Sequence, residues 1–358
     1  MAKCRPQKGV PMTVQIRPFD PSMATERELV DHHEMSAAAR ALDMPEDPPL
    51  TYEAATGRLL SPPPTDGACI YWAAYLDGRL IGRVKAALPD GDNAGVAKVQ
   101  VLVHPEQRRH GIGLALLRAA MPAILETKRG AIMGEAMKPD SAGARCADRL
   151  GFQITHSTVM QVLLVADVPA DRWDVPVDPG YRLERWIGTT PEHLIDSCAT
   201  ARQAIRDAPT GQASFRDEST WTPESIREAE RNLAAKGVEQ RVVVAVDSAT
   251  GLVAGLTGML RYPHRREFGY QDNTSVLATH RGHGLGRAMK AAMMRWITRD
   301  WTGLDRIITA SATENTYMIA VNRALGYYPA RSMIWVETTP AQLAETLAAL
   351  PDPRQGHC

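Results

Sequence analysis

Apolar and polar positions along the chain predict strands, hairpins and helices in one order, and this order occurs twice. Residues 13–20 and 180–187 each have a strand-like pattern, and each is followed by a polar stretch, rich in Glu, Arg and Ala, that favours a helix. Further along, Asp77-Gly78 divides one pair of apolar runs, and residues 248–251 divide another. Turn residues between two apolar runs are typical of β-hairpins, so we expect one hairpin in each half of the chain.

A second set of matching segments follows each hairpin. Residues 95–113 and 268–286 both consist of a β-like run, a basic turn and a Gly-x-Gly sequence, and both lead into a segment with helical spacing. Later in each half the chain reads ADRLGF at 147–152 and NRALGY at 322–327. The two series lie about 175 residues apart, and two ordered matches at one offset indicate an internal repeat.

The repeats divide the chain of 358 residues into two domains, which its length also favours. Residues 164–180 are rich in proline and aspartate and break the periodicity, as a linker would. We therefore predict two α/β domains in tandem. The expected boundaries are a flexible N-terminal tail at 1–12, a first domain at 13–165, a linker at 166–180, a second domain at 181–340, and a C-terminal helix and tail at 341–358.

The charge of the chain gives no support to some classes of partner. Lys and Arg number 41, as do Asp and Glu, and such a balance predicts no basic surface for nucleic acid or an anionic membrane. No apolar run is long enough to cross a bilayer. The five cysteines are scattered and form no CxxC pair, so we expect reduced thiols, no metal site and a cytoplasmic location.

Two glycine turns carry the candidate chemistry. The first consists of Arg108, Arg109, His110, Gly111, Ile112 and Gly113, and the second of Arg281, Gly282, His283, Gly284, Leu285 and Gly286. Glycines at a helix start let a phosphate approach the backbone, where free amides and the helix dipole favour an anion. A Gly-rich connection without a ligand is the simpler alternative. A dinucleotide fingerprint is another, although its third glycine is missing, and a Walker A sequence is absent.

A strand, the sequence Arg-x-x-Gly-x-Gly, a helix and a later Leu-Gly-Phe or Leu-Gly-Tyr together resemble the GNAT acetyltransferase family, over about residues 13–165 and 180–338. The resemblance implies an α/β (α+β) fold of two tandem GNAT domains. Each would have a mixed, mostly antiparallel sheet flanked by helices, with central strands that splay apart. It also implies that acetyl-CoA or another acyl-CoA binds as co-substrate, with its pyrophosphate on a glycine turn.

The resemblance also marks residues for the pantetheine arm of CoA. In the family, the strand end before the turn binds the pantetheine and the thioester carbonyl through its backbone. This position is Val103 in the first repeat and Val276, followed by Leu277, in the second. Arg287 would flank the second turn, and Asn315 occupies the place of an asparagine that often contacts the pantetheine in the family.

Attack of an amine on a thioester requires a group that takes the proton of the amine. Members of the family often place a carboxylate on the strand that ends at the glycine turn. Because side chains alternate along a strand, Asp272 and Thr274 are expected on the same face as Val276. Asp272 is therefore the expected general base, acting directly or through a water, with capping of a strand or pairing to an arginine as its structural alternatives. Glu267 and Glu314 are weaker candidates.

The usual acid of the family, a tyrosine four residues before the glycine of the later element, is missing from both repeats. Ala147 and Asn322 take its place. Asn322 is a candidate donor to the CoA sulfur, and Tyr317 is either a substitute acid or an aromatic packing residue. Asn315 has Asp140 as its counterpart in the first repeat. Because the second repeat matches the family better, we expect it to catalyse, while the first binds CoA or is structural.

The acceptor is the least constrained part of the prediction. Residues 205–236 form a long polar stretch that resembles the acceptor-side insertions of actinobacterial tandem GNAT enzymes, some of which modify antibiotics, sugars or thiol precursors. We expect an N-acyltransferase, most simply an N-acetyltransferase, that acts on a small-molecule amine by direct attack in a ternary complex. A protein or peptide N-acetyltransferase and a CoA-binding module without catalysis are the alternatives. The chain is expected to be a monomer or a homodimer.

Overall fold

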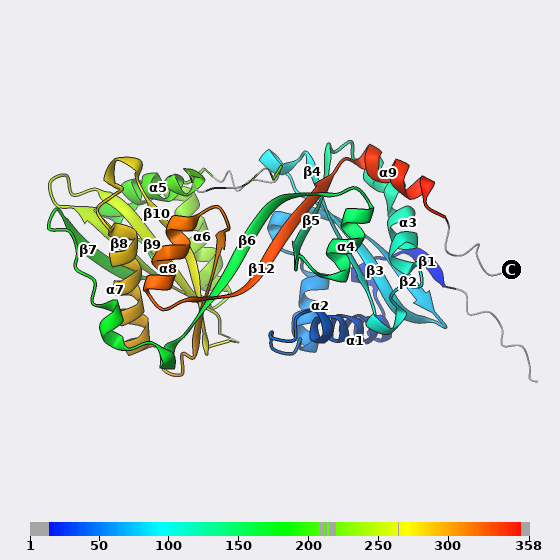
Figure 1. Ribbon diagram of the computed structural model, residues 1–358, viewed down its shortest axis with the longest axis horizontal. Coiled ribbons are helices and arrows are strands. Elements are labelled where there is room, and N and C mark those ends of the chain that lie inside the picture. The colour runs from blue at the N-terminus through cyan, green and yellow to red at the C-terminus, as the bar shows by residue number, and fades with distance from the viewer. Residues whose placement is uncertain are drawn as a thin grey trace, which may run out of the picture. The chain divides into compact units, whose positions relative to one another are not determined.

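The computed structural model describes residues 14–351 except 208, 210, 212, 215–219 and 264. The chain forms two compact units (Figure 1). The N-terminal unit comprises Met1–Thr155, Ala213–Arg216 and Ile334–Cys358, and the C-terminal unit comprises His156–Gln212 and Asp217–Met333. None of the helices in the described part of the chain combines the length and the apolar character needed to cross a membrane.

The N-terminal unit is built on a sheet in the strand order β1-β2-β3-β4-β5-β12. Its strands are β1 (Gln15–Pro18), β2 (Ala68–Leu76), β3 (Arg79–Leu88), β4 (Val96–Val103), β5 (Ala131–Met137) and the C-terminal half of β12 (Tyr328–Thr338). Neighbouring strands are antiparallel except β4 and β5, which are parallel. The helices of this unit are α1 (Glu26–Asp43), α2 (Tyr52–Leu60), α3 (Ile112–Glu126), α4 (Ala142–Arg149) and α9 (Pro340–Ala349).

The C-terminal unit repeats this plan, with the strand order β6-β11-β10-β9-β8-β7. Its strands are most of β6 (Gln153–Leu164), β7 (Tyr181–Ile187), β8 (Glu239–Asp247), β9 (Val253–Arg261), β10 (Phe268–Val276) and β11 (Arg306–Ala312). Here β10 and β11 are the parallel pair. The helices are α5 (Ile195–Gln203), α6 (Pro223–Ala235), α7 (Leu285–Asp300) and α8 (Thr316–Ala324).

Both predicted hairpins are present, because their turn residues adopt the backbone conformations that such turns need. Asp77 and Gly78 have φ angles of 51° and 78°, which a two-residue turn between twisted strands favours, and they join β2 to β3. Residues 248–252 join β8 to β9, with Gly251 at φ 74°. The predicted fold class, with mixed, mostly antiparallel sheets flanked by helices, is confirmed.

The last strand of each repeat pairs outside the unit that contains most of that repeat. β6 belongs to the first repeat in sequence, but its residues 158–164 pair antiparallel with β11 of the C-terminal unit. β12 belongs to the second repeat, but its residues 334–338 pair antiparallel with β5 of the N-terminal unit. α9 packs in the N-terminal unit as well. The compact units therefore follow other boundaries than the domains at 13–165 and 181–340, which remain a prediction about the sequence repeats.

The segment 166–180, which the sequence predicts to be a linker, packs within the C-terminal unit. Trp173 ends the 3-10 helix η6 (Ala170–Trp173), is buried, and donates from Nε1 to the carbonyl of Leu325 at 3.0 Å. Arg172 donates to two further carbonyls at the C-terminal end of α8. Because the last carbonyls of a helix lack partners and favour a cation, this segment caps α8. The predicted tail at 1–12 lies outside the described residues.

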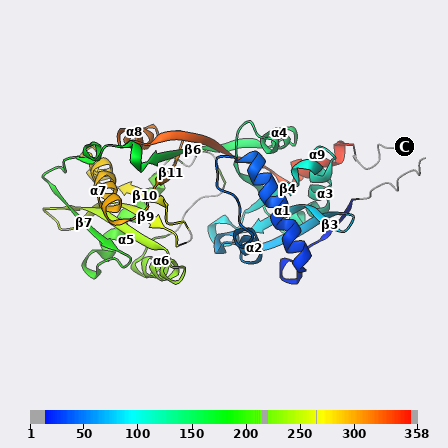
Figure 2. The ribbon, with the colours of Figure 1, turned by 90° about the horizontal axis from the view of Figure 1, so that it is seen from below.

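Helices cover both faces of each sheet (Figure 2). In the N-terminal unit, α1 and α2 pack on one face around Met35, Leu59 and Tyr71, and α3 packs on the other around Leu116 and Ile124. Burial of large apolar side chains on both faces supplies most of the stabilisation of such a layered unit.

The C-terminal unit has the same two layers. α5 and α6 cover the face that carries Leu256, and α7, through Met289, covers the face that carries Met259. Each sheet therefore has one face covered by the helices that follow β1 or β7 and one face covered by the helix that follows its glycine turn.

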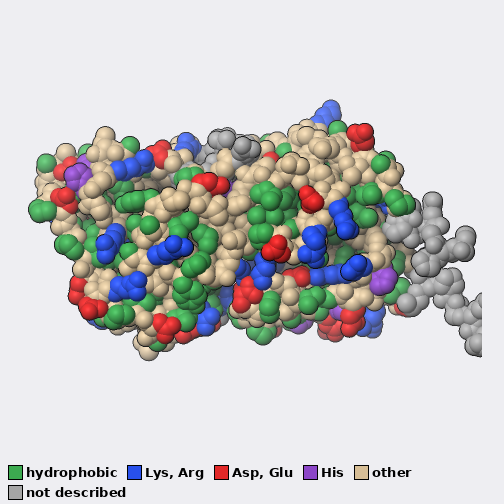
Figure 3. All heavy atoms as spheres, viewed as in Figure 1, with side chains coloured by type: hydrophobic (Ala, Val, Ile, Leu, Met, Phe, Trp, Pro, Cys, Tyr) green, Lys and Arg blue, Asp and Glu red, His purple; other side chains and the backbone are tan. Residues whose placement is uncertain are grey.

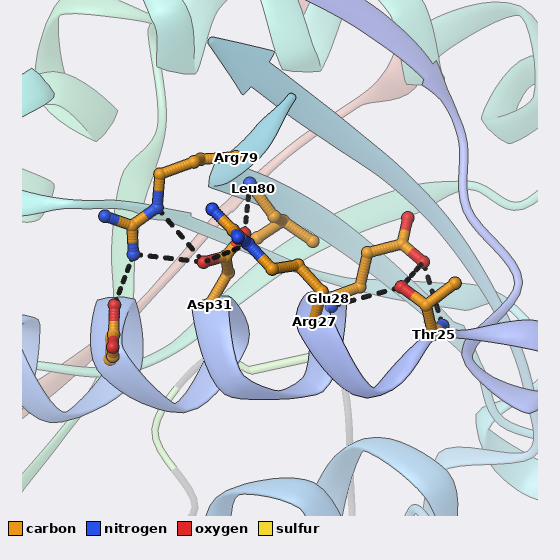
Figure 4. Close-up of polar contacts among 7 residues, drawn as sticks. Thr25, Arg27, Glu28, Asp31, Arg79 and Leu80 are labelled. Carbon is orange, nitrogen blue, oxygen red and sulfur yellow. Dashed lines mark hydrogen bonds and ion pairs between the residues drawn. The ribbon is translucent and has the colours of Figure 1, made fainter. Parts of the chain in front are cut away.

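Helix α1 is held to the β2–β3 hairpin by a buried carboxylate (Figure 4). Thr25 and Glu28 form a capping box that starts the helix. One turn later, Asp31 accepts a hydrogen bond from the backbone amide of Leu80 at 3.0 Å and from Arg79 Nη2 at 3.0 Å. Since this carboxylate is almost fully buried, it fixes the rotation of α1 over the sheet.

Candidate active site

The two glycine turns have the same backbone path. Positive φ angles occur at Arg109 and Gly111 in the first turn, 67° and 74°, and at Gly282 and Gly284 in the second, 90° and 69°. Gly111 and Gly284 are the N-caps of α3 and α7, and no side chain caps either helix start. The predicted order of strand, turn and helix is confirmed in both repeats, and uncapped amides at a helix start suit an anion.

The space around the two turns differs. In the second turn, a Cβ added at any of the three glycines would meet no atom within 4 Å. In the first turn, a Cβ added at Gly113 would meet Val101 Cγ1 at 3.6 Å and Val103 Cγ2 at 4.0 Å. Gly286 is itself buried, yet the space at its Cα is open. The two turns therefore differ at their last glycine, which contacts β4 side chains at ordinary van der Waals distance in the first turn and has open space beside it in the second.

The two motif arginines brace their turns in the same way. Arg108 donates through Nε to the carbonyl of the strand-end residue at 3.2 Å and through its Nη atoms to Asp43 at 2.8 and 2.7 Å. Arg281 donates through Nε to its strand-end carbonyl at 3.1 Å and through Nη2 to Asp207 at 2.5 Å. These contacts hold strand end, turn and an upstream helix together. Binding of CoA by the two arginines remains a prediction.

The other side chains of the two turns differ in whether they form hydrogen bonds within the protein. His283 Nδ1 lies 2.9 Å from Asp178 Oδ2, and this hydrogen bond is the largest cause that lowers the pKa of Asp178. By contrast, Arg109, His110 and Arg287 are exposed and make no hydrogen bond or ion pair to any residue that the structure describes. The side chain of Arg287, in the first turn of α7, is thus free to meet an anion.

The central parallel strands of each sheet part from one another, as the family resemblance implies. β4 pairs with β5 only from Val96–Lys98 to Ala131–Met133. β10 pairs with β11 only from Phe268–Tyr270 to Arg306–Ile308. Beyond these three pairs, both strands of each couple continue without pairing to each other. At the end of β10, the amide of Leu277 donates to β9 at 2.9 Å.

A β-bulge in β10 changes the face on which Asp272 lies. The register against β9 shifts between Gln271 and Thr274, so two residues of β10 oppose Gly258 alone. Thr274 Oγ1 lies 2.7 Å from Thr257 Oγ1, whereas a Cβ added at Gly258 would meet Asp272 Oδ2 at 3.0 Å. Consecutive residues of a strand point to opposite faces. The expectation that Asp272 and Thr274 share a face is therefore wrong, because the extra residue interrupts the alternation.

Asp272 lies on the face that α5 and α6 cover. Leu256, two residues before Gly258 in β9, packs in the cluster of those helices. Asp272 is half-buried, and its carboxylate makes no hydrogen bond or ion pair to any described residue, so the structural alternative of an arginine partner is not found among them. Glu267 is exposed before the first residue of β10, and Glu314 is exposed in the turn before α8. Of the three carboxylates, Asp272 alone combines partial burial with a position beside the parted strands.

The corresponding places in the first repeat are apolar. β4 pairs with β3 without a register shift, and Val99, Val101 and Val103 pack on the side of α3, as the alternation predicts. Ala147, in the place of the missing tyrosine, lies in an apolar cluster with Ile334. No carboxylate of the described residues stands on β4 at the position of Asp272.

The three polar residues predicted on and beside α8 lie in different environments. Asn322 is fully buried, and its Nδ2 donates to Gln161 Oε1 at 2.9 Å, while its Oδ1 has no partner. Asn315 is the N-cap of α8, and its Oδ1 accepts from the amide of Met318 at 3.1 Å. Tyr317 is 64% exposed, which argues against the packing role and leaves its hydroxyl accessible. Their roles in catalysis and CoA binding stay predictions.

Sequence reasoning missed Lys290, a buried cation one turn into α7. Its side chain is 1% exposed, and Nζ lies 5.5 Å from the ring centre of Tyr327. Burial lowers its pKa from 10.5 to about 7. The equivalent residue of α3, counted from the last glycine of each turn, is the buried Leu117. A comparison of α3 and α7 position by position in the sequence would have identified Lys290 as a charged residue at a position where α3 has a leucine.

Other features of the described residues do not add to this site. A pocket of about 340 Å³ lies beside the C-terminal half of α7, away from the glycine turn, and it is lined by residues that include Trp173, Asp174 and Arg295. No group of three or more His, Cys, Asp or Glu side chains in the described part of the chain is arranged to hold a metal ion. The described cysteines, Cys69, Cys146 and Cys198, are free.

Comparison with known proteins agrees with the repeat and with the geometry of the turns. The model of the acetyltransferase (GNAT) family matches the chain twice, at residues 36–152 and 203–327. Mycothiol acetyltransferase from Salinispora arenicola is 30% identical over 260 residues, which are 70% of this chain and 75% of that protein. Mycothiol acetyltransferase from Saccharomonospora viridis is 26% identical over 245 residues, 66% of this chain and 72% of that protein.

Solved structures show the same fold. A tandem GNAT protein from the clavulanic acid biosynthesis pathway has a TM-score of 0.72 and 26% sequence identity, covering 92% of this chain and 99% of its own. A GCN5-related N-acetyltransferase from Sphaerobacter thermophilus has a TM-score of 0.62 at 15% identity, over 91% of this chain and 96% of its own, and supports the fold alone. The duplicated glycine turns, the parted strands and these matches together place the chain in the acetyltransferase (GNAT) family, which uses acetyl-CoA as co-substrate, and show it to be an N-acetyltransferase with two tandem GNAT repeats.

Proposed function

We propose that the second repeat binds acetyl-CoA and transfers the acetyl group to the amine of a small molecule, by direct attack in a ternary complex. The observation that carries this proposal is the position of Asp272. Its carboxylate has no partner among the described residues and stands at a bulge in β10, four residues before the strand end that leads into the open glycine turn. The first repeat has the turn but lacks this carboxylate.

The start of α7 is the proposed site of the CoA pyrophosphate. The amides that follow Gly284 are not capped by a side chain, and the helix dipole favours a negative charge there. Arg287 adds an exposed guanidinium without a partner among the described residues. The open space at Gly282, Gly284 and Gly286 is what a phosphate group close to the backbone requires.

The chemistry needs one base and little else. Asp272 takes a proton from the acceptor ammonium, directly or through a water, and the freed amine attacks the thioester carbonyl carbon. The new carbon–nitrogen bond forms, the nitrogen loses its second proton to water, the carbon–sulfur bond breaks, and the sulfur leaves as a thiolate. A thiol has a pKa of about 8.5, so water can return the proton without a dedicated acid. The absence of the family tyrosine from both repeats is compatible with this scheme.

A small-molecule acceptor fits the surroundings of Asp272 and the relatives of the chain. Asp272 lies on the α5 and α6 face; α5 precedes the polar stretch 205–236 that is expected to form the acceptor side, and α6 lies within that stretch. The relatives are named after mycothiol and after clavulanic acid biosynthesis, which supports a metabolite as acceptor. On the face drawn in Figure 3, Lys and Arg side chains are interspersed with Asp and Glu, and this mixed surface does not favour a basic peptide.

The test is an assay of thiol release from acetyl-CoA with a panel of amines: amino sugars, amino-acid derivatives, aminoglycosides, and peptides with a free N-terminus or lysine. The expected result is turnover with one class of small amine and a product whose mass has increased by one acetyl group. Turnover with peptides alone would favour the protein or peptide N-acetyltransferase instead. Binding of acetyl-CoA without turnover of any amine would support a CoA-binding module and contradict the proposal.

A further inference from the structure

An arginine without a counter-ion lies on the α1 and α2 face of the N-terminal unit. Arg83, in β3, donates from Nε to His32 Nε2 at 3.1 Å and from Nη2 to Gln100 Oε1 at 2.9 Å. Its Nη1 is buried and has no hydrogen-bond partner in the part of the chain that the structure describes. No carboxylate of the described residues forms an ion pair with Arg83. Burial lowers the pKa of Arg83 to about 10, so the guanidinium is still charged at neutral pH.

His32 positions this guanidinium and remains neutral. It lies in α1, is 2% exposed, and accepts through Nε2, since an arginine can only donate. Its hydrogen is therefore on Nδ1, which is buried and has no partner. Burial, together with the nearby Arg83 charge, lowers the pKa of His32 to about 3. Because Asp31 fixes the rotation of α1 (Figure 4), the neighbouring His32 is held against the sheet.

A third polar atom without a partner lies on the same face. Tyr71, in β2, is 6% exposed, and its buried hydroxyl lies near the Cys69 thiol but has no geometric hydrogen-bond partner among the described residues. Burial is the main cause that raises its pKa to about 12, so the hydroxyl keeps its proton and can donate. Tyr71 pairs with Lys85 in the register of β2 and β3, and is thus the diagonal neighbour of Arg83 on one face. Diagonal neighbours are within reach of long side chains.

The charges around Arg83 leave one positive charge without a match. Lys85 and Lys98 both contact Asp66, at 2.5 and 2.9 Å, and Lys98 also contacts Glu135 at 3.1 Å. These two lysines and two carboxylates balance each other. The guanidinium of Arg83 is left over, and a buried charge without a partner is strongly disfavoured.

We propose that the N-terminal unit binds a small carboxylate with a single negative charge at Arg83 and Tyr71. Two N–H groups of Nη1 and one of Nη2 remain free on Arg83, and the planar fork of a guanidinium matches the two oxygens of a carboxylate. The Tyr71 hydroxyl supplies a further donor, and His32 and Gln100 position the guanidinium. Gln100 is exposed and Tyr71 is buried, so the carboxylate enters past Gln100.

The single negative charge of a small carboxylate distinguishes this proposed ligand from a phosphate. One negative charge compensates the one unmatched guanidinium, whereas a phosphate with two charges would leave an excess. The site stands on residues of the first repeat outside its glycine turn, so it does not depend on which repeat transfers the acetyl group.

The test is a titration of the full chain with sodium acetate, followed by the line width of ¹³C-labelled acetate and by the thermal midpoint, against sodium chloride at equal ionic strength. Acetate is expected to raise the midpoint more than chloride. In Arg83→Met, acetate should bind about tenfold more weakly or not at all, because charged hydrogen bonds are lost. Arg58→Met removes an equal charge from an exposed position of α2 and should respond like the wild type.

Tyr71→Phe is a second variant for the same titration, and it tests the site even if Arg83→Met does not fold. The Tyr71 hydroxyl has no geometric hydrogen-bond partner among the described residues, and its neighbour Cys69 is unchanged in this variant, so removal of the hydroxyl should leave the fold intact and weaken acetate binding by a few-fold. An equal response to acetate and chloride in the wild type, or an unchanged response in both variants, would overturn the proposal. If inorganic phosphate raises the midpoint as much as acetate does, and only when Arg83 is present, the site is a general anion site and the assignment to a carboxylate is wrong.

Discussion

The two glycine turns of this chain share a backbone and differ in their surroundings. Both have positive φ angles at the second and fourth motif positions, both start a long helix, and both are braced by an arginine that bonds a strand-end carbonyl and an upstream aspartate. Around the first turn, valines of β4 approach Gly113. Around the second, the space at the glycines is open, and a bulge in β10 presents Asp272.

The glycine motif alone indicates a place where an acyl-CoA can bind. The side chains on the neighbouring strands and helices determine whether that repeat can also catalyse. Because the two motif arginines make equivalent contacts, they do not distinguish one repeat from the other. The distinguishing groups are Asp272 and Asn322 in the second repeat, against a valine-rich β4 and Ala147 in the first. We therefore expect variants of the second repeat to affect turnover and variants of the first to affect stability or other ligands.

The largest expected effect is that of removing the proposed base. Asp272→Asn should lower kcat by about 10²- to 10⁴-fold, the range for loss of a general base, and leave acetyl-CoA affinity unchanged. Steady-state kinetics with the acceptor found in the amine panel, and calorimetry with acetyl-CoA, measure the two quantities. Glu267→Gln, an exposed carboxylate just before β10, is the matched control and should behave like the wild type. Equal kcat in both variants would remove Asp272 from the mechanism.

The next effect concerns the buried cation of α7. Burial lowers the pKa of Lys290 from 10.5 to about 7, so the unfolded chain binds more protons than the folded chain between these values, and stability should rise with pH there. Lys290→Leu, which copies Leu117 of the first repeat, should raise the thermal midpoint at pH 7 and flatten this rise.

The useful window for this comparison is about pH 7 to 9. Above it, burial of Cys198, which raises that thiol pKa from 9.0 to about 12, favours the protonated folded state and begins to lower stability with pH. Thermal scans of the wild type and of Lys290→Leu across the window provide the measurement. Parallel pH profiles of the two proteins would show that Lys290 keeps its charge at no cost to folding.

The smallest expected effect lies in the turns themselves. Arg109 has φ 67°, a conformation that costs a non-glycine residue about 1 kcal/mol, whereas its counterpart Gly282 adopts φ 90° without that cost. Gly282→Arg should therefore lower stability by about 1 kcal/mol. Arg109→Gly should raise it by less, because glycine adds freedom to the unfolded chain. Denaturant titrations of the reciprocal pair measure both, and a stabilising Gly282→Arg would contradict the equivalence of the turns.

Local turn chemistry explains why much of the fold follows from the sequence. Asp77-Gly78 and the glycines of the two turns demand positive φ angles, and the strands and helices around them were predicted on that basis. The pairing partners of the last strand of each repeat, β6 and β12, could not be predicted in the same way. β6 and β12 close similar repeats, so their patterns fit either unit, and only the pairing in the structure shows which one each joins.

The site was predicted less completely, because its decisive features depend on distant residues. The bulge that turns Asp272 away from Thr274 exists only relative to Gly258 of the partner strand. The aspartates that pair with the motif arginines lie 65 and 74 residues upstream. Unpartnered atoms such as Arg83 Nη1 emerge only when every neighbour is known.

The assignment of acetyl-CoA binding and catalysis to the second repeat can be tested with two variants, Gly286→Trp and Gly113→Trp. Acetyl-CoA is titrated calorimetrically into both, and the amine assay is run on the same proteins. A Cβ at Gly286 would meet no atom within 4 Å, so the thermal midpoint of Gly286→Trp is measured first to show that the protein is folded, and in the folded protein the indole should exclude the ligand. The account predicts that Gly286→Trp loses both binding and turnover, and that Gly113→Trp keeps turnover as long as its thermal midpoint shows a folded protein. If Gly113→Trp alone abolishes turnover, the first repeat is the catalyst. If both variants bind acetyl-CoA like the wild type, the glycine turns do not hold the co-substrate and the account is contradicted.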